Sequence, residues 1–595
     1  MGPAEQVFPA GPPGRFPRLL ARPGLGVNER YASLLQVQSL MPRQAPEKKF
    51  SNSTHPVTDR YRMGSVSKKP PLRNRLARLA AAAAVGLAAA VVAVGAGELV
   101  AAFTGPDSAP VIAVGSAAID LTPTPLKEYA VRTFGTNDKP VLLAGIQLTM
   151  AGLAVLAGLL AVRRRGLGAA VFVLFGGLAV WAALSRPVAG PADALPALAA
   201  GAVGAAALVL LAALVGPPRA VAVPEDGPVS ARTEPPSGGP PRRVLLAATG
   251  GTVLLGGLAL AGGRRLSDSR YDVSAARDAV RLPAPAVPAP PLPAGVGPGT
   301  PGLPPFVTPN RDFYRVDTAL TLPRIDPRRW TLRIHGLVDR PLLITYDELL
   351  RYPLEELDHT LSCVSNEVGG PYVGTTRWLG VALPALLRRA GVRAGADQLV
   401  GRSQDGMTIG TPLESVLDGR RALLAVAMNG EVLPVEHGFP CRTVVPGFYG
   451  YTSATKWLVD LDVTTFAAHD PYWVKRGWDR TGAVRTASRI DVPAPFARVA
   501  AGDVTVAGTA WATHRGIAAV ELRVDGGPWT QARLATDAGP DLWRQWSLTW
   551  SGARPGTHRL EVRATDGTGA VQTEDRASPF PAGATGWHST VVTVT

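Results

Sequence analysis

Cys363 is one of only two cysteines in this chain of 595 residues. It stands in the segment 361–370, whose sequence is LSCVSNEVGG. Small residues, a polar amide and a Gly-Gly turn are typical of a thiolate presented on a loop, and they do not indicate a core packing position. The alternatives are a disulfide with Cys441, the single bridge that two cysteines allow, and an inert buried thiol.

The elements expected to position Cys363 are short strands that alternate with helices. The predicted elements are a strand at 330–334, a helix start capped by Thr345 with Glu348 three residues on, a helix at 381–390, a strand at 422–428 and a hairpin turn at Asn429-Gly430. This alternation predicts an α+β domain that begins at about residue 306.

Five apolar stretches in the first half have the length of about 20 residues that a membrane-spanning helix needs. They lie at approximately 79–103, 140–162, 167–185, 194–215 and 244–262. Basic residues precede the first stretch, fill the turn between the second and third, and lie between the fourth and fifth. Because such residues stay on the cytoplasmic side, an odd number of spans places everything after residue 262 outside. We expect a multi-pass protein of the cytoplasmic membrane with an extracytoplasmic catalytic domain.

The net charge of +15 comes mostly from the residues ahead of the first apolar stretch. Residues 1–78 hold 14 Lys and Arg against four Asp and Glu. No basic stripe interleaved with aromatic residues follows later in the chain, so nucleic acid is not an expected partner.

Two features of the apolar half concern export and electron transfer. Arg242-Arg243, with the prolines before it and the apolar run after it, resembles a twin-arginine export signal placed internally, although an ordinary basic flank explains it equally well. None of the eight histidines lies in a predicted span. We therefore expect no membrane haem with paired His ligands within this chain, so that any haem would belong to a partner.

Composition divides the chain into five parts. Residues 1–62 are polar and Pro-rich, and we expect them to be a disordered extension, with Met63 as an alternative start. Residues 63–265 are expected to form a transmembrane domain of about five helices, and 266–305 a stiff Pro/Ala-rich linker. The catalytic domain is expected at 306–470 and a further β domain at 471–595.

The last of these parts alternates polar and apolar residues with a period of two. The pattern is clearest at 504–508, 519–525 and 558–564, and Asp525-Gly526-Gly527 and Asp566-Gly567 supply turns. Such patterning predicts a β-sandwich.

Three separated motifs make the second half of the chain similar to a known family. The segment 361–366 resembles the molybdenum-ligand loop of the sulfite oxidase family of molybdopterin-dependent oxidoreductases. The resemblance continues through 429–442 and 444–447 to Lys456-Trp457, and it covers about 306–595. The first half resembles the membrane domains fused to some bacterial members.

The resemblance implies a multi-domain fold. An N-terminal α-helical transmembrane domain would precede an α+β molybdopterin-binding domain of sulfite-oxidase type and a C-terminal immunoglobulin-like β-sandwich. In the family this last domain serves for dimerisation. A homodimer is therefore one assembly that the resemblance allows, although a fused membrane domain can change how the chain assembles.

The resemblance also implies the cofactor, a molybdenum-molybdopterin, and the residues that hold it. Molybdenum bound by a dithiolene is soft and takes a thiolate, so Cys363 would be the metal ligand and the catalytic residue. Charge-assisted hydrogen bonds suit the phosphate of the pterin. The implied cofactor-binding residues are Asn310, Phe313, Tyr314, Cys363, Asp405, His437, Arg442, Ser453 and Lys456, with Thr455 as the alternative to Ser453. Cys441 is interpreted as a small buried hydrophobe.

Departures from the family pattern bear on the substrate. Sulfite- and nitrate-using relatives follow the loop's Asn with paired arginines that attract the anion, whereas Glu367 and Val368 follow Asn366 here. A carboxylate near the molybdenum would repel sulfite, which favours a neutral substrate such as a sulfoxide. The substrate-pocket candidates are Asn366, Glu367 and Tyr472, the last only near the place of the family's active-site tyrosine.

The main hypothesis is a membrane-anchored, extracytoplasmic molybdopterin oxidoreductase that carries out two-electron oxygen-atom transfer. Its partners would be the lipid bilayer, a small-molecule substrate and an electron-transfer partner, either a quinol or a haem protein. The alternatives are a non-enzymatic, membrane-anchored surface protein that retains the fold, and a true sulfite oxidase. An enzyme requires Asp405, Arg442 and Lys456 to converge on one pocket with Cys363, whereas a merely structural fold would scatter them.

Overall fold

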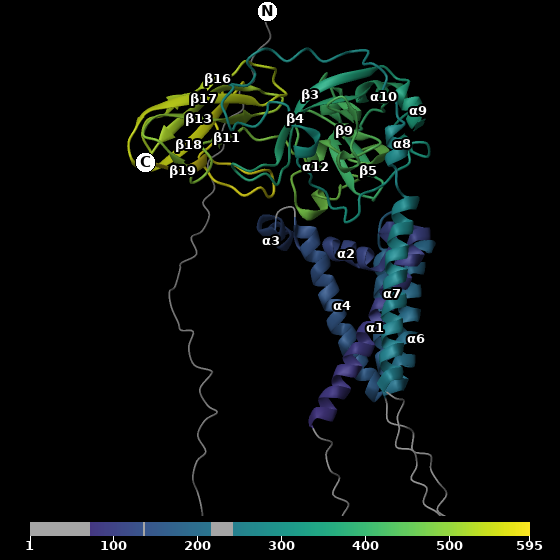
Figure 1. Ribbon diagram of the computed structural model, residues 1–595. Coiled ribbons are helices and arrows are strands. Elements are labelled where there is room, and N and C mark those ends of the chain that lie inside the picture. Colours follow the sequence, from purple (N-terminus) through teal and green to yellow (C-terminus); the bar gives the residue numbers. More distant parts are fainter. Residues whose placement is uncertain (1–71, 135–136, 216–241) are drawn as a thin grey trace, which may run out of the picture. The chain divides into compact units, whose positions relative to one another are not determined.

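A computed structural model describes residues 72–134, 137–215 and 242–595. Figure 1 shows the chain as a ribbon. The predicted disordered extension 1–62, the alternative start Met63 and the prolines before Arg242 lie outside the described residues.

The first half of the described chain is helical, as predicted, and is called the helical domain below. Its elements are α1 (Leu72–Thr104), η1 (Pro106–Ser108), α2 (Pro110–Leu121), α3 (Thr124–Phe134), α4 (Asp138–Arg163), α5 (Arg165–Leu184), η3 (Pro191–Ala194), α6 (Leu195–Val215) and α7 (Arg242–Arg270). Among the described residues, five helical segments are long and apolar enough to cross a membrane: Arg75–Thr104, Lys139–Arg163, Arg165–Leu184, Pro191–Val215 and Arg242–Asp278. Each overlaps one of the five predicted stretches, and the fifth continues beyond the predicted end at residue 262.

Small residues let these helices approach closely. Helix α1 packs against α4, α6 and α7, and Figure 1 shows α1, α6 and α7 side by side. A methyl group at Gly86 of α1 would overlap the carbonyl oxygen of Ala154 in α4, and one at Gly158 would overlap that of Ala82. Close backbone approach at glycine is the packing expected between helices in a bilayer, where contact itself drives association.

Two shorter helices, α2 and α3, lie between the first and second long helices. Neither helix was predicted from the sequence. Helix α2 is apolar but has only 12 residues, too few to cross a bilayer at 1.5 Å per residue. Both helices contact the part of the chain that follows residue 306: the contacts of α2 are described below, and Lys127 of α3 lies 5.8 Å from the centre of the Tyr472 ring.

The central domain, predicted at 306–470, is α+β. Its elements are η4 (Asn310–Asp312), β1 (Thr331–Gly336), β2 (Leu342–Thr345), α9 (Tyr346–Leu350), β3 (Leu354–Ser362), β4 (Val373–Ala382), α10 (Leu383–Ala390), β5 (Gln398–Ser403), β6 (Thr408–Pro412), α11 (Leu413–Leu417), β7 (Leu423–Met428), β8 (Glu431–Val432), η5 (Val435–His437), β9 (Arg442–Val444), α12 (Gly450–Ser453), β10 (Leu458–Thr464) and η6 (Val474–Arg476).

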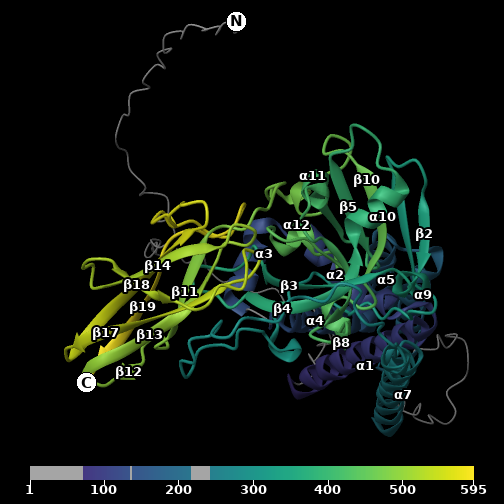
Figure 2. The ribbon, with the colours of Figure 1, turned by 90° about the horizontal axis from the view of Figure 1, so that it is seen from above.

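These strands form two sheets that share one apolar core. One sheet has the order β2-β1-β10-β5-β6, with β1 and β10 parallel, and the other has the order β3-β4-β7-β8, with β9 paired to β7. Leu332 of β1, Leu386 of α10, Leu424 of β7 and Leu461 of β10 belong to the same fully buried cluster. Figure 2 shows β5 and β10 beside α10 and α11 in this domain. The core therefore fixes the ends of β3, β7 and β9, from which the candidate site extends.

Local sequence signals predicted these elements well. The Thr345 hydroxyl accepts from the Glu348 N–H while the Glu348 carboxylate accepts from the Thr345 N–H, so the predicted cap of α9 is present. The Asn429-Gly430 turn joins the antiparallel strands β7 and β8, with both residues at positive φ.

The segment predicted to be a linker lies along the central domain. After α7 the chain forms α8 (Ser274–Asp278) and then extended backbone. The N–H of Ala286 donates to the carbonyl of Leu354, and the N–H of Glu356 donates to that of Val287. Residues around 287 thus add main-chain hydrogen bonds to the edge of β3, which sequence composition did not indicate.

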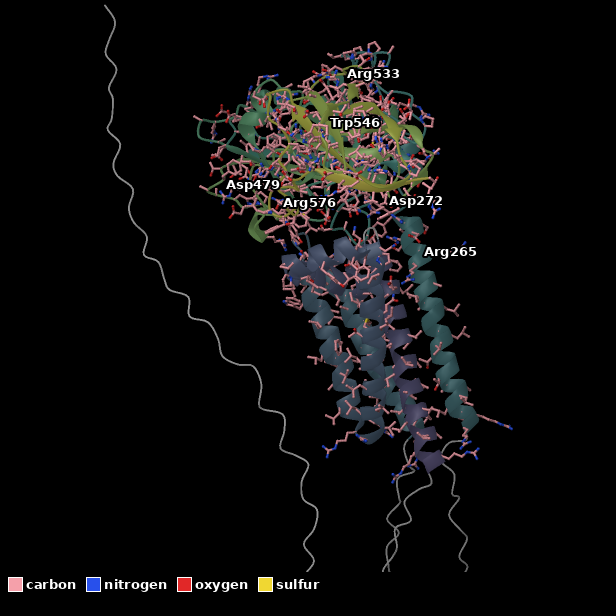
Figure 3. The ribbon with its side chains drawn as sticks, turned by 90° about the vertical axis from the view of Figure 1, so that its left-hand side faces the viewer. Arg265, Asp272, Asp479, Arg533, Trp546 and Arg576 are labelled. Carbon is pink, nitrogen blue, oxygen red and sulfur yellow. The ribbon has the colours of Figure 1, made fainter. Side chains whose placement is uncertain are left out.

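The C-terminal part is a sandwich of two sheets, as predicted. Its strands are β11 (Ala487–Val492), β12 (Arg498–Val499), β13 (Gly502–Trp511), β14 (Ile517–Val524), β15 (Thr530–Gln531), β16 (Arg533–Leu534), β17 (Arg544–Ala553), β18 (Gly556–Asp566) and β19 (His588–Val594). The sheet orders are β11-β13-β17-β16 and β12-β19-β18-β14-β15. Trp546, labelled in Figure 3, is fully buried between them.

Candidate functional site

Cys363 lies directly after β3, at the start of the loop that leads to β4. Its side chain is buried and unpaired, and Cys441 is also a free, fully buried thiol, so no disulfide joins them and Cys441 is a small buried group, as interpreted from the sequence. The Cys363 N–H donates to the carbonyl of Tyr372 at 2.9 Å, and the Asn366 side-chain oxygen accepts from the Tyr372 N–H at 2.8 Å. The two ends of the loop are thereby tied together around the thiol.

Two opposing effects act on the Cys363 thiol. Burial raises its pKa, while hydrogen bonds from Ser365 and the positive charge of Lys456 lower it. A buried thiol of this kind stays protonated and unreactive in the absence of a metal. Metal coordination displaces the proton, because the thiolate is the form that binds.

An aromatic group covers one side of the loop. The rings of Phe313 and Tyr314 stack at 5.0 Å between centroids, and the Phe313 ring meets that of His437 edge-on at 5.5 Å. Burial raises the pKa of Tyr314 well above its usual value, and a negative charge on Cys363 would raise it further. Tyr314 therefore stays neutral as a hydrogen-bonding hydroxyl close to the thiol.

The turn between β7 and β8 holds the chain segment that carries these rings. The Asn429 side-chain amide donates to the side-chain oxygen of Asn310 at 2.9 Å, and the Asn310 amide donates to the carbonyl of Met428 at 3.1 Å. The His437 Nε2–H donates to the carbonyl of Asn310 at 3.1 Å. Burial lowers the pKa of His437 to about 4, so the imidazole is neutral at pH 7.

Arg442, at the start of β9, is a buried cation. Its side chain donates to the carbonyl of His437 at 3.1 Å, and its guanidinium lies 4.8 Å from the centre of the Trp378 ring. Burial lowers its pKa to about 10. No carboxylate of the described residues forms an ion pair with it. A buried guanidinium with only carbonyl and aromatic neighbours fits an anionic ligand such as a phosphate.

Lys456 forms the other end of the site, and its ammonium group is paired. The Lys456 Nζ donates to Asp317 at 2.7 Å, and the two side chains are 11% and 5% exposed. Burial lowers the pKa of Lys456 to about 8, and the Asp317 carboxylate opposes that shift. Asp317 also accepts from Arg315 at 2.9 Å and from Lys139 of α4 at 2.7 Å.

The remaining predicted residues have different surroundings. Asp405 lies in the turn between β5 and β6, where burial raises its pKa and the neighbouring Asp317 charge raises it further. Asp405 therefore belongs to the Lys456 end. The Ser453 hydroxyl donates to the carbonyls of Tyr449 and Phe448, within its own turn. The Ser453 hydroxyl proton is therefore used within its own turn.

Electrostatic interactions link four of the predicted cofactor residues. The charge of Arg442 lowers the pKa of both His437 and Lys456, and that of Lys456 lowers the pKa of Cys363. Among residues 72–134, 137–215 and 242–595, no cluster of three His, Cys, Asp or Glu side chains is arranged to hold a metal. A metal at Cys363 would therefore take most of its ligands from an organic cofactor, and the donor set fits a molybdenum dithiolene with a phosphate tail.

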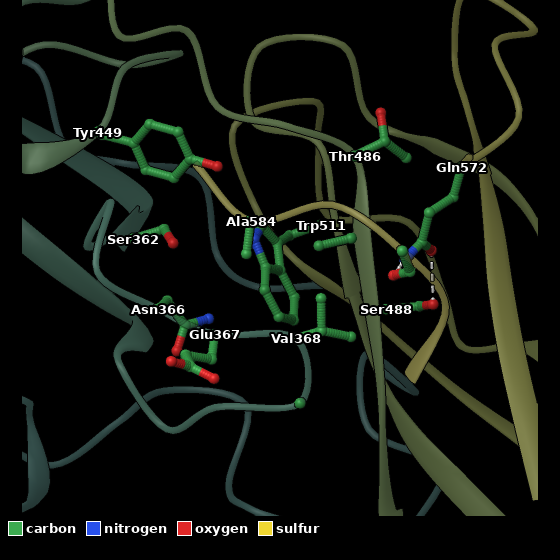
Figure 4. A pocket seen from close by; sticks show the side chains of 13 residues that line it. Ser362, Asn366, Glu367, Val368, Tyr449, Thr486, Ser488, Trp511, Gln572 and Ala584 are labelled. Carbon is green, nitrogen blue, oxygen red and sulfur yellow. Dashed lines mark hydrogen bonds between the residues drawn. The ribbon is translucent and has the colours of Figure 1, made fainter. Parts of the chain in front are cut away.

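A small pocket lies beside the cysteine loop. Ser362, Asn366, Glu367 and Tyr449 line it from the central domain, and residues of the β-sandwich line the rest, among them Thr486, Ser488, Trp511 and Gln572. Figure 4 shows the two groups facing each other, with the Ser488 hydroxyl donating to Gln572. Its cavity volume is about 20 Å³, enough for a single water molecule. None of the residues that line it carries a positive charge.

The structure does not bring Tyr472 to this pocket. Its hydroxyl donates to the Asp120 carboxylate of α2 at 2.7 Å, and Arg476 packs over its ring at 3.4 Å. Asn366 and Glu367 do line the pocket. Tyr472 instead belongs to the contact between the central and helical domains.

Sequence reasoning missed three polar residues at the site. Tyr449 lines the pocket, Asp317 binds Lys456, and Lys139 reaches Asp317 from the helical domain. Tyr449 follows the motif at 444–447, and its position could have suggested a role. Asp317 and Lys139 have no local signal, because their pairing joins positions far apart in the chain.

Cys363, His437, Arg442 and Lys456 lie within a recognised domain. The family model described as "Oxidoreductase molybdopterin binding domain" matches residues 319–473, and that described as "Bacterial Ig domain" matches residues 488–562. The "Uncharacterized oxidoreductase YuiH" of Bacillus subtilis is 34% identical over 161 residues, which are 26% of this chain and 76% of that protein.

Enzymes of known name are also similar. The sulfite oxidase of Gallus gallus is 32% identical over 293 residues, covering 41% of this chain and 63% of that protein. A nitrate reductase [NADH] of Solanum lycopersicum is 34% identical over 199 residues, covering 29% of this chain and 21% of that protein. The chain thus spans less than two thirds of the length of these two enzymes.

Proposed function

The chain belongs to the sulfite oxidase family of molybdopterin-dependent oxidoreductases, and on that premise we propose that it reduces a neutral substrate such as a sulfoxide at an extracytoplasmic, membrane-anchored site. The proposed reaction is two-electron oxygen-atom transfer, in which a sulfoxide, two protons and two electrons give a sulfide and water.

Charge distribution supports the proposed orientation. Arg163, Arg164 and Arg165 stand between α4 and α5, and Arg242 and Arg243 begin α7. These residues lie at helix ends that follow the positive-inside pattern when they face the cytoplasm. The start of α4, where Lys139 meets Asp317, is then on the outer side with the central domain.

The residues of the site suit the proposed cofactor. The bound molybdenum-molybdopterin supplies the two-electron redox chemistry and the place where oxygen is transferred. Cys363 would hold the metal as a thiolate, and Arg442 would donate charge-assisted hydrogen bonds to the anionic part of the cofactor. Phe313, Tyr314 and His437 would lie beside the pterin and exclude water, and Asp405 would accept hydrogen bonds from pterin N–H groups.

The charges on the walls of the pocket support a neutral substrate. Oxyanion recognition calls for buried Arg or Lys, whereas the wall next to Asn366 bears the carboxylate of Glu367. The nearby Arg489 is already held by Asp491 at 2.6 Å. The Tyr449 hydroxyl, which accepts from the Arg485 N–H at 3.2 Å, retains a proton to donate. We assign this hydroxyl to orienting a sulfoxide oxygen, with Trp511 beside the apolar groups of the substrate.

Substrate entry requires a small opening of the pocket, because its volume in this structure admits about one water molecule. Glu367 is exposed, whereas Asn366 is buried. The Glu367 side chain is therefore the part of the wall that moves aside.

A substrate comparison on the purified, molybdenum-loaded chain tests the proposal. Sulfoxides are supplied with a reduced dye, and sulfite with an oxidised dye. We expect kcat/KM for a methyl sulfoxide to exceed that for sulfite by at least about tenfold. A preference for sulfite in the wild type would overturn the choice of a neutral substrate.

A charge reversal at the pocket provides the matched variant. Glu367→Arg should raise kcat/KM for sulfite by about tenfold or more, because it replaces repulsion by attraction at a range of several ångströms. Glu367→Gln should give a smaller increase. The rate with a neutral sulfoxide should change little in either variant.

A true sulfite oxidase is the second candidate, and the 32% identity to the sulfite oxidase of Gallus gallus supports it. In that case the wild type should prefer sulfite to a sulfoxide, and Glu367→Arg should keep that preference. For either substrate, we propose that electrons pass to or from a quinol or a haem protein, and that any haem belongs to that partner.

A further inference from the structure

The helical domain meets the central domain at the Lys456 end of the candidate site. Lys139 of α4 binds Asp317, and the Thr321 hydroxyl hydrogen-bonds to Asp107 of η1. Between these two contacts, the side chain of Leu320 packs at Gly115 of α2. The segment 315–324 therefore lies against three separate elements of the helical domain.

A second contact reaches the turn that carries Asp405. Pro187, in the connection between α5 and η3, packs so closely on Gly406 that a methyl group there would overlap its ring. The charges of Asp107 and Asp317 both raise the pKa of Asp405. Residues of the helical domain thus border both the Lys456 side and the Asp405 side of this end of the site.

Asp317 joins the two domains through a pair of lysines. Its carboxylate receives Lys456 Nζ of the central domain and Lys139 Nζ of α4, both at 2.7 Å. The Asp317 side chain is 5% exposed, that of Lys456 is 11% exposed and that of Lys139 is 21% exposed. Two ammonium groups gathered on one acidic group, shielded from solvent, form a geometry that a phosphate also fits, because both anions accept several charge-assisted hydrogen bonds.

We propose that the helical domain is part of the cofactor site. Its segments around Asp107, Gly115 and Pro187 close the Lys456 end, and Lys139 of α4 is a further binding residue for the anionic end of the cofactor. This inference rests on the proposed function, because Lys456 borders the cofactor only if the chain binds one. Lys139 then acts with Lys456 on one anion, and the anion shares the two lysines with Asp317.

Closure has a consequence for how the cofactor is held. With Pro187 on Gly406 and Lys139 on Asp317, the cofactor leaves only after the helical domain separates from the segment 315–324. Retention of the cofactor therefore depends on a residue outside the molybdopterin-binding domain matched at 319–473.

The test measures cofactor release from the full chain, purified in detergent from a host that makes the cofactor. Molybdenum and pterin per protein are followed over time after dilution, and each release rate is compared with that of the wild type. Lys139→Ala removes one charge-assisted hydrogen bond and should speed release by about tenfold. Lys139→Gln, which keeps most of the length without the charge, should speed it nearly as much, and Lys139→Arg should restore a rate close to that of the wild type.

The matched control is Arg324→Ala. Arg324 binds Asp268 at 3.1 Å, so it also joins the segment 315–324 to α7, but through an exposed pair that does not involve Asp317. Its release rate should stay within about twofold of the wild type, as expected for an exposed ion pair.

Two results would overturn the inference while leaving the proposed function intact. In the first, Lys139→Ala and Lys139→Gln release the cofactor at the wild-type rate. In the second, Arg324→Ala speeds release as much as Lys139→Ala does, which would reduce Lys139 to a general docking contact. A wild-type chain that carries neither molybdenum nor pterin would instead overturn the proposed function, and this inference with it.

Discussion

The two ends of the candidate cofactor site are built differently. At the inner end, Cys363 and Arg442 lie wholly within the central domain, and Arg442 has only carbonyl and aromatic neighbours. At the outer end, Lys456 is paired with Asp317, which also binds Lys139 of the helical domain. One end keeps a buried cation without a counter-charge, and the other supplies a counter-charge from within the chain.

This difference separates binding from stability. A buried cation without an acid partner weakens the empty fold and strengthens the binding of an anion, because desolvation has already occurred. A paired cation stabilises the empty fold and binds an added anion less strongly. The inner end should therefore respond to the cofactor more than the outer end, and substitutions at the two ends should change the stability of the empty protein in opposite directions.

The largest effect is expected at Cys363. Cys363→Ser should lower kcat by about 10³-fold or more, because an alcohol is a poor ligand for a soft metal at neutral pH. Because Cys363 forms no disulfide, its replacement should change the free energy of unfolding by less than about 1.5 kcal/mol. Turnover and thermal unfolding of the same preparation check both points, and Cys441→Ser is the control, which should retain turnover. A Cys363→Ser protein that keeps wild-type turnover would remove the thiolate from the mechanism.

Arg442→Met tests the cation without a counter-charge. The empty protein should become more stable by about 1–3 kcal/mol, because a buried charge is replaced by an apolar side chain of similar length. The loaded protein should lose molybdenum and pterin faster by at least about tenfold. Urea unfolding of the empty variant and cofactor content of the loaded variant give the two values. A loss of stability in the empty variant would contradict the contrast between the two ends.

Lys456→Met is the counterpart at the outer end. Here the empty protein should lose about 1 kcal/mol of stability, since Asp317 keeps Lys139 and Arg315 but gives up one of its three partners. Urea unfolding of the empty variant measures this loss. If Lys456→Met and Arg442→Met both gained stability, the ion pair between Lys456 and Asp317 would not stabilise the empty protein.

The inner end was the part that the sequence could predict. Segments 361–366 and 429–442 place Cys363 directly after β3, His437 at the end of η5 and Arg442 at the start of β9. Strand pairing within one domain then brings β3 and β9 into one sheet. Local signals such as the Asn429-Gly430 turn are sufficient, because the backbone of the turn requires positive φ. The predicted elements of the central domain therefore positioned these residues well.

The outer end was not predictable in this way. Lys139 and Asp317 are 178 positions apart, and neither stands in a motif. Their contact depends on how helices α2 and α4 meet the segment 315–324, which is tertiary packing that periodicity does not encode. Tyr472 shows the same limit: the sequence suggested a substrate pocket, whereas the tyrosine faces Asp120 of α2.

The last expected effect concerns acid. Burial lowers the pKa of His437 at the inner end to about 4, whereas an unfolded histidine titrates near 6.5. Between these values the unfolded chain binds more protons than the folded one, so stability falls as the pH drops from about 6.5 to about 4. Burial likewise lowers the pKa of His359 and of His588 to about 4, so the wild type alone does not isolate His437.

The variant His437→Gln separates this contribution. Urea unfolding of the empty protein at pH 7 and at pH 4.5 gives the stability lost on acidification, and the loss should be smaller in the variant by about 1–2 kcal/mol. Asp317 at the outer end does not interfere in this range, because its pKa is lowered by Lys456, Arg315 and Lys139 against the effect of burial, and its charge is lost only in stronger acid. Equal losses in the wild type and the variant would mean that His437 is not held neutral, and that the inner end owes its response to acid to other groups.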